Sequence, residues 1–310
     1  MDEFARIKEF FAPLAGEAGL GLQDDAAVLT PPSGRQLVLT VDQMLEGVHF
    51  LPGDDPALTA RKLLRRNLSD LAAMGATPFG YLITTALPSA LPDTWLARFT
   101  AGLETDQRQF GISLLGGDSS SSRADIMLTA CLLGHVAPGQ ALRRNGARVG
   151  DELWVTGTIG DAVLGLEARL GRLPDPDGFL ARRSLLPDPR VGLNLEGIAT
   201  AAIDISDGLL QDLGHICRAS GLAAIVQAEL VPLSAQAAAL GPEVLERRLT
   251  GGDDYELLLA VPPEKSDALQ SACAGIRVTK IGGFQPGEGV ELRDENGSPL
   301  NIASAGWKHF

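Results

Sequence analysis

The sequence has few cysteines, few histidines and a shortage of positive charge. Its three cysteines, Cys131, Cys217 and Cys273, are too scattered for a disulfide framework or a CxxC metal site, so we interpret them as buried small hydrophobic residues. The four histidines show no HxxH or HExxH spacing. The formal net charge of −13 argues against broad nucleic-acid binding, which depends on lysine and arginine, and we expect no nucleic-acid partner.

Long hydrophobic runs are also missing. The longest, such as residues 257–261, are far too short to cross a bilayer. The opening Met1-Asp2-Glu3 has no basic region followed by an apolar core, unlike a signal peptide. We therefore expect a cytoplasmic protein with no membrane partner.

Common nucleotide-binding motifs are absent as well. The chain contains no Gly-Lys pair, which excludes the P-loop, and it has neither a protein-kinase catalytic set nor a complete GxGxxG fingerprint. Any nucleotide site must therefore use a less usual scaffold.

The length and the apolar content indicate two globular domains. The chain has 310 residues, of which 45% are hydrophobic, enough for more than one buried core. A polar, turn-rich stretch at 137–149 separates an N-terminal domain, residues 1–137, from a C-terminal domain, residues 138–310. A second stretch rich in proline and glycine, 171–188, predicts a surface loop.

Hydrophobic patterns predict a mixture of strands and helices. Strands are indicated by apolar, β-branched runs at 36–41, 81–87, 126–133, 153–156, 224–226 and 257–261. Several helical segments lie between these runs, so we predict an α/β fold of the α+β type.

The segment 57–75 has the apolar spacing of an amphipathic helix. Four basic residues are expected on its far, solvent side: Arg61, Lys62, Arg65 and Arg66. Asp70 lies at the edge of the apolar stripe, where a carboxylate is costly unless it binds a metal or pairs with a buried partner such as an arginine. Both explanations of Asp70 stay open.

Aspartates recur in turns and at strand ends, next to small residues. They occur as Asp24-Asp25, Asp42, Asp118 in GGD, and Asp204 with Asp207 in DISDG. Converging carboxylates need a cation to stay ionised together, and hard oxygen ligands favour Mg²⁺, which could bridge to nucleotide phosphates. The alternative is that each aspartate is a turn former or helix N-cap.

Two glycine-rich turns, 157–161 and 251–254, could present backbone N–H groups to an anion, although such turns are usually structural. His49 is the histidine of most interest, because it follows Asp42 within a short turn-like segment.

Six sequence blocks occur in the order found in the thiamine-monophosphate kinase family, which the chain resembles over nearly its whole length. The blocks are DDAAV at 24–28, VDQMLEGVHF at 41–50, NLSDLAAMGATP at 67–78, GGD at 116–118, DISDGL at 204–209 and GGDDYEL at 251–257. The resemblance implies the two-domain fold of the aminoimidazole ribonucleotide synthetase superfamily. It also implies a homodimer built through the N-terminal sheets and an α/β C-terminal domain.

The same resemblance implies a set of site residues. Magnesium ligands would be Asp25, Thr40, Asp42, Asp70, Asp118, Asp204 and Asp207, with Asp42, Asp70 and Asp207 central to catalysis. Gly117, Asp118, Arg144 and Ser206 would bind ATP, and His49, Asp253 and Trp307 would face thiamine monophosphate. Trp307 can stack on a cationic ring, although it could instead be a hydrophobic terminal anchor. Three positions differ from the family: Gln23 replaces a usual glycine, Asp253 replaces a usual glutamate, and Val41 replaces a common threonine, which leaves Thr40 as the hydroxyl ligand.

The implied activity is direct transfer of the ATP γ-phosphoryl group to thiamine monophosphate, with several Mg²⁺ ions neutralising charge. One alternative is another ATP-using member of the superfamily. Selenophosphate synthetase and the hydrogenase-maturation dehydratase are disfavoured, since no cysteine precedes Cys131 and the chain ends in Phe310. The other alternative is a non-catalytic nucleotide or thiamine-phosphate sensor.

Overall fold

The computed structural model describes residues 3–302 and residue 306. The chain forms two compact units: residues up to Leu71 together with Ala76–Gly139, and Ala72–Gly75 together with the residues from Gln140 onward. The mixed α/β class predicted from the sequence is confirmed. No helix among the described residues is long and apolar enough to span a membrane.

The helices are α1 Glu3–Arg6, α2 Pro56–Ala73, α3 Asp93–Phe110, α4 Asp161–Arg169, α5 Phe179–Leu185, α6 Leu209–Ser220, α7 Ala235–Ala239, α8 Leu245–Thr250 and α9 Ser266–Ala272. The strands are β1 Gln36–Leu45, β2 Thr77–Pro88, β3 Ser113–Ser122, β4 Met127–Val136, β5 Glu152–Thr156, β6 Ala201–Asp204, β7 Ala223–Gln227, β8 Leu257–Val261, β9 Val278–Gln285 and β10 Gly289–Arg293. Shorter helical turns cover Ile7–Phe11, Ala12–Leu14, Glu17–Leu22, Ala228–Leu230, Pro242–Val244 and Pro263–Lys265.

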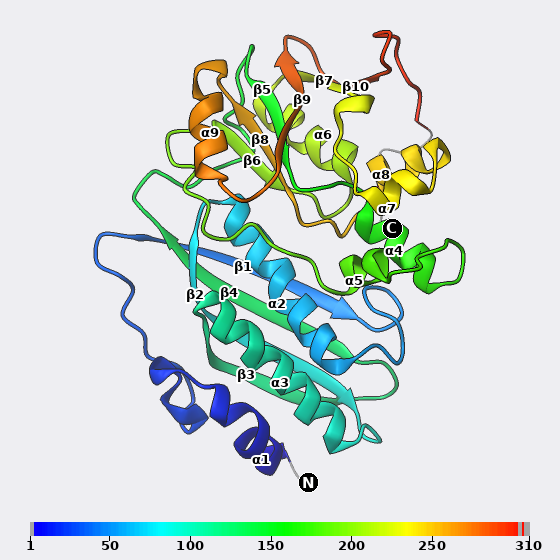
Figure 1. The fold of residues 1–310 in the computed structure, drawn as a ribbon. Coiled ribbons are helices and arrows are strands. Elements are labelled where there is room, and N and C mark those ends of the chain that lie inside the picture. Colours follow the sequence, from blue (N-terminus) through cyan, green and yellow to red (C-terminus); the bar gives the residue numbers. More distant parts are fainter. Residues whose placement is uncertain (1–2, 303–305, 307–310) are drawn as a thin grey trace. The chain divides into compact units, whose positions relative to one another are not determined.

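The first unit is built on a four-stranded sheet in the order β1-β4-β2-β3. β4 pairs antiparallel with β1 and β2, and β2 pairs parallel with β3. Helices α2 and α3 lie across one face (Figure 1). The apolar stripe of α2 is fully buried at Leu63, Leu64, Leu68 and Leu71, so the helix predicted at 57–75 forms because it covers the sheet.

The other face of this sheet is exposed and partly apolar. Along β1 the side chains alternate, and Leu37, Leu39 and Val41 are 41%, 60% and 63% exposed. Cys131 of β4 lies opposite both Val41 and Leu82 of β2, so one row of this face crosses three strands.

The basic residues of α2 are not all directed to solvent. Lys62 and Arg65 are only 6% and 4% exposed, so the prediction of a solvent-facing basic side was wrong for these two. The fully buried Asp106 of α3 accepts hydrogen bonds from Arg61 at 2.8 Å and from Arg65 at 2.7 Å. This paired charge ties α2 to α3.

The second unit contains a six-stranded sheet in the order β10-β7-β9-β5-β8-β6. Apolar side chains of β5 and β8 pack alternately into two cores, one shared with α6 and the other with α9. Because the sheet is buried on both faces, β8 is apolar at every position rather than at alternate ones.

One predicted loop is partly helical. Residues 171–188 include α5, whose Leu180 and Ser184 are buried. The proline and glycine residues that suggested a loop flank this short helix.

Candidate active site

The first unit holds a pocket of about 580 Å³ at strands β2 and β3. Its lining includes three of the predicted site residues, Asp25, Gly117 and Asp118, together with Asp24 and Thr84. The rest of the lining is mostly apolar: Ile7, Phe11, Gly19, Leu22, Ala26, Ala27, Leu29, Leu82, Ile83, Leu114, Leu115, Gly116, Ser119 and Leu133. The size is typical of small-molecule pockets, and the lining combines apolar surface for a ring with carboxylates for cations.

Close backbone packing places the aspartate loop beside β3. The N–H of Gly16 donates to Leu114 O at 3.0 Å, and that of Val28 donates to Ala18 O at 2.9 Å. At Gly117 a Cβ atom would lie 1.9 Å from Ile83 O, so only glycine lets β3 approach β2 this closely. Strand packing is therefore a local reason for the glycine at position 117 of the GGD block.

A second group of predicted residues lies between β1 and α2. Thr40 Oγ1 donates to Asp70 Oδ2 at 2.5 Å, and Arg66 Nε lies 3.7 Å from Asp42 Oδ2. Thr40 and Asp42 are two residues apart on β1 and so point to the same face of the sheet. The carboxylates of Asp42 and Asp70 and the hydroxyl of Thr40 therefore all lie where β1 faces α2.

His49 is held in the turn after β1. Leu45 N–H donates to His49 Nδ1 at 3.0 Å, and Lys62 Nζ donates to His49 O at 3.1 Å. Because Nδ1 accepts this bond, a neutral His49 carries its proton on Nε2.

In the second unit, Asp212 organises the DISDG turn. The N–H groups of Ser206, Asp207 and Gly208 donate to Asp212 Oδ2 at 3.0, 3.0 and 3.1 Å. Burial raises the pKa of Asp212 to about 7, although these donors lower it. Asp204 ends β6 just before the turn and is 4% exposed. Sequence reasoning missed Asp212, although it stands only three residues after the DISDGL block.

The segment 251–256 packs against the same turn. Asp253 N–H donates to Ser206 O at 2.9 Å, and Tyr255 N–H donates to Ile205 O at 2.8 Å. A Cβ on Gly252 would lie 2.1 Å from Ser206 O. The structure thus brings the predicted residues Asp204, Ser206, Asp207 and Asp253 onto adjoining segments.

The predicted ATP contact Arg144 is less constrained. Arg144 is exposed, and its carbonyl accepts from Ser220 Oγ at 3.0 Å. Burial, followed by the charges of Arg218 and Arg144, lowers the pKa of His215, which places Arg144 in the electrostatic surroundings of α6. Trp307 lies outside the described residues.

Within the described part of the chain, no three histidine, cysteine, aspartate or glutamate residues form a group that could hold a metal ion. Magnesium is commonly held by one or two carboxylates together with waters and substrate phosphates, rather than by a cage made only of protein. The paired oxygens of Thr40 and Asp70, and the carboxylates that line the pocket, fit that pattern.

Two family models match most of the chain. The N-terminal domain of AIR synthase related protein matches residues 23–136, and the C-terminal domain of AIR synthase related protein matches residues 148–295.

Curated relatives match at nearly full length. The thiamine-monophosphate kinase of Caulobacter vibrioides is 43% identical, over 99% of this chain and 90% of its own. The thiamine-monophosphate kinase of Escherichia coli K12 is 38% identical, over 99% of this chain and 98% of its own.

Solved structures agree. The crystal structure of thiamine-monophosphate kinase from Stenotrophomonas maltophilia has a TM-score of 0.83 at 38% identity and covers 96% of this chain and 95% of its own. The structure of AaThiL complexed with AMPPCP and TMP has a TM-score of 0.80 at 32% identity and covers 99% and 97%. A hydrogenase maturation protein HypE, at 20% identity and a TM-score of 0.78, shows the fold alone.

Proposed function

Because the chain belongs to the thiamine-monophosphate kinase family, we propose that it uses ATP to phosphorylate thiamine monophosphate, giving thiamine diphosphate in the final step of that biosynthesis. One structural observation carries the proposal for this chain. The pocket on β2 and β3 is lined by Asp25, Gly117 and Asp118, and these belong to the DDAAV and GGD blocks. A relative solved with AMPPCP and TMP supports the pairing of substrates.

The pocket is proposed as the site of the nucleotide in the first unit. Its apolar lining suits a heteroaromatic ring, while Asp25 and Asp118 supply carboxylates for the cations that accompany phosphates. In the second unit, Arg144 and Ser206 are proposed as further ATP contacts. The assignment of residues 1–137 as the ATP- and metal-binding dimerisation domain, and of 138–310 as the C-terminal domain, belongs to this proposal.

Magnesium is proposed as the cofactor, in several ions. The candidate ligands are oxygen donors throughout: Asp25, Thr40, Asp42, Asp70, Asp118, Asp204 and Asp207. When bound, Mg²⁺ would neutralise charge on the donor and acceptor phosphates. Among the ligands, Asp42, Asp70 and Asp207 are proposed as the catalytic set.

The acceptor is proposed to contact His49, Asp253 and Trp307. A carboxylate such as Asp253 suits the positive charge of a thiazolium ring, and a tryptophan can stack on it. The hydrogen bond from Tyr255 OH to Asp253 Oδ1, at 3.1 Å, helps to fix the direction of that carboxylate.

Transfer is proposed to be direct and in line, without a covalent enzyme intermediate. The acceptor phosphate is already anionic at neutral pH, so no general base is needed to activate it. The task of the protein is to position two anions that repel each other.

The proposal extends to assembly and location. A homodimer built through the exposed face of β1, β4 and β2 would cover Leu39 and Val41, which are unusually exposed for their size. The proposed location is the cytoplasm, where ATP is available as the phosphoryl donor.

The decisive experiment is a turnover assay with purified protein, ATP and thiamine monophosphate. Product is expected with Mg²⁺, and none with EDTA. Asp70→Asn, which keeps the shape of the side chain but removes a ligand charge, should lower turnover by about a hundredfold.

Asp93→Asn is the matched control. Asp93 lies on α3 in the same unit, and its Oδ1 is 2.9 Å from Arg6 Nη2 on α1. The variant should keep its activity. If the wild type binds ATP but forms no thiamine diphosphate, the kinase function is wrong, and a sensor becomes the alternative.

A further inference from the structure

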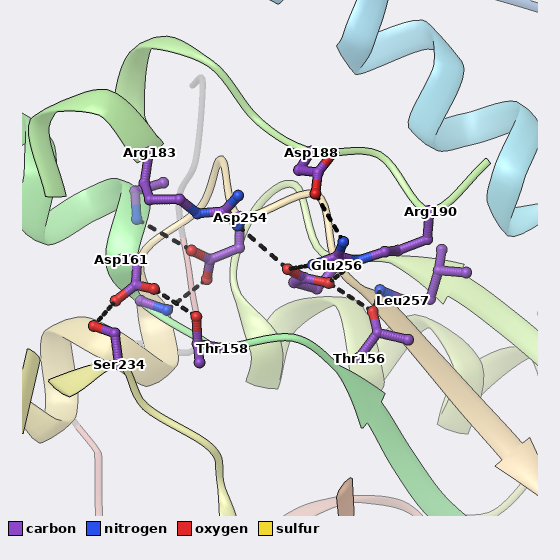
Figure 2. A network of polar contacts seen from close by, with 12 residues as sticks. Thr156, Thr158, Asp161, Arg183, Asp188, Arg190, Ser234, Asp254, Glu256 and Leu257 are labelled. Carbon is purple, nitrogen blue, oxygen red and sulfur yellow. Dashed lines mark hydrogen bonds and ion pairs between the residues drawn. The ribbon is translucent and has the colours of Figure 1, made fainter. Parts of the chain in front are cut away.

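A network of polar contacts, drawn in Figure 2, includes Asp254 and Glu256, which follow the proposed acceptor residue Asp253 in the chain. The next residue, Asp254, is 1% exposed, and Glu256 is fully buried. Burying an unpaired carboxylate costs free energy, so the partners of these two side chains show what holds the segment in place.

Glu256 is bound by three side chains from other parts of the second unit. Thr156 Oγ1 on β5 donates to Oε2 at 2.7 Å, and Arg183 Nη2 on α5 donates to Oε1 at 3.2 Å. Arg190 contacts both carboxylate oxygens, through Nε to Oε2 and Nη2 to Oε1. Burial alone would lower the pKa of Arg190, but the ion pair with Glu256 raises it.

The backbone between these anchors adopts an uncommon conformation. Asp253 and Tyr255 have φ values of +71° and +52°, a region that residues with side chains seldom occupy. Such conformations persist when the surroundings over-determine them. Asp254 supplies one anchor, because it accepts from Gly160 N–H at 2.7 Å and Ala162 N–H at 3.2 Å. Glu256 supplies the other, beyond Tyr255.

We propose that Glu256 is a positioning residue for the phosphate acceptor: clamped by Arg183 and Arg190, it holds residues 253–255 in the strained conformation that sets the direction of the Asp253 carboxylate. The inference rests on the proposed function, in which Asp253 contacts thiamine monophosphate. The residues that do the clamping come from α5 and the following segment, so the acceptor site depends on a part of the chain that carries none of the family blocks.

The test compares KM values for the two substrates. Glu256→Gln keeps the shape and can still accept from Thr156, but it removes the charge that Arg183 and Arg190 share. We expect the KM for thiamine monophosphate to rise roughly tenfold, as for other residues that orient a contacting group. The KM for ATP should stay unchanged.

Arg190→Lys is the second variant, since lysine keeps the charge but loses the two-pronged contact. It should raise the same KM by a smaller factor, and it protects the test if Glu256→Gln folds poorly. Glu152→Gln is the matched control, because Glu152 also pairs with a cation, Lys280, and a hydroxyl, Ser266, in the same unit. It should leave both KM values unchanged.

Calorimetric binding of thiamine monophosphate, without ATP, separates the two claims. A wild type that makes no product defeats the proposed function, and weaker binding to the variants then still supports the role of Glu256. Folded variants that bind the acceptor as tightly as the wild type, or that raise both KM values equally, overturn the inference.

Discussion

The surroundings of Asp254 disfavour the ionised form of its carboxyl group. Burial raises its pKa from the ordinary 3.8 to about 8, although the N–H groups of Gly160 and Ala162 lower it. Between about pH 4 and pH 8, Asp254 is protonated in the folded state, whereas the same carboxyl has lost its proton in the unfolded chain. The free energy of unfolding therefore falls as pH rises through this window, and the contribution of the neutral carboxyl is fully present only below about pH 4.

Asp254→Asn cannot ionise, which gives a prediction with a definite sign. The free energy of unfolding of the variant, relative to the wild type, should shift in favour of the variant as pH rises from about 4 to about 8, by at most about 1.4 kcal/mol per pH unit. Urea denaturation at a series of pH values measures this difference.

Asp177→Asn is the control, because the hydrogen bonds from Gln236 and Phe179 lower the pKa of that exposed carboxyl. Its difference from the wild type should stay flat between about pH 5 and pH 8. A flat difference for Asp254→Asn over the same range contradicts the prediction.

The sequence could identify the charged blocks but not which charges are buried. GGDDYEL indicates a functional segment, yet nothing in it separates the half-buried Asp253 from the buried Asp254 and Glu256. The reason is that burial depends on distant partners. Arg190 is 66 residues from Glu256, and Asp106 is 41 residues from Arg65. Local patterns contain no such information.

Among the elements, the contact between the DISDG turn and the 251–256 segment requires a glycine. A Cβ on Gly252 would lie 2.1 Å from the backbone oxygen of Ser206 and 3.2 Å from Asp207 Cα. Gly252→Ala should therefore separate the two segments, lower the free energy of unfolding by about 1–3 kcal/mol or more, and reduce turnover. Thermal unfolding and the turnover assay measure both effects.

Gly214→Ala on α6 is the comparison for this change. Its Cβ would meet only the flexible end of Arg218 at 3.2 Å, and alanine favours a helix over glycine by about 1 kcal/mol. This variant should be as stable as the wild type or more stable. If Gly252→Ala behaved in the same way, the close contact would be wrong.

The strands that the sequence predicted share one property, which is continuous or alternating apolar character. All six predicted runs lie wholly or almost wholly within strands, whereas β3, β6, β9 and β10 were not predicted. β3 has the sequence SLLGGDSSSS, which lacks a strand pattern. Its pairing with β2 requires Gly117, and its exposed end is polar. β6 has only four residues, too few for a period to be recognised. Tertiary packing, rather than local propensity, makes these segments strands.

At the scale of the molecule, the sequence resemblance predicted the two-unit α/β architecture and the family. The resemblance predicted which residues belong to the site, but not which of them lie next to each other in space. The structure groups Asp25 with Asp118 around one pocket, Thr40 with Asp70 in a hydrogen bond, and Ser206 with Asp253 on adjoining segments. Those groupings depend on strand register and on turns closed by glycine, which an ordered series of short blocks cannot specify.

The exposed face of the first sheet gives the prediction for the whole molecule. Leu39→Glu should convert the expected dimer into a monomer, because burying an unpaired carboxylate costs several kcal/mol and each 1.4 kcal/mol raises the dimer Kd about tenfold. Sedimentation velocity at micromolar concentration measures the change. Leu230→Glu is the control, since Leu230 is also exposed, at 44% against 60% for Leu39, but belongs to the second unit. It should remain dimeric. A wild type that sediments as a monomer, or a dimer that Leu39→Glu leaves intact, would show that this face has another use.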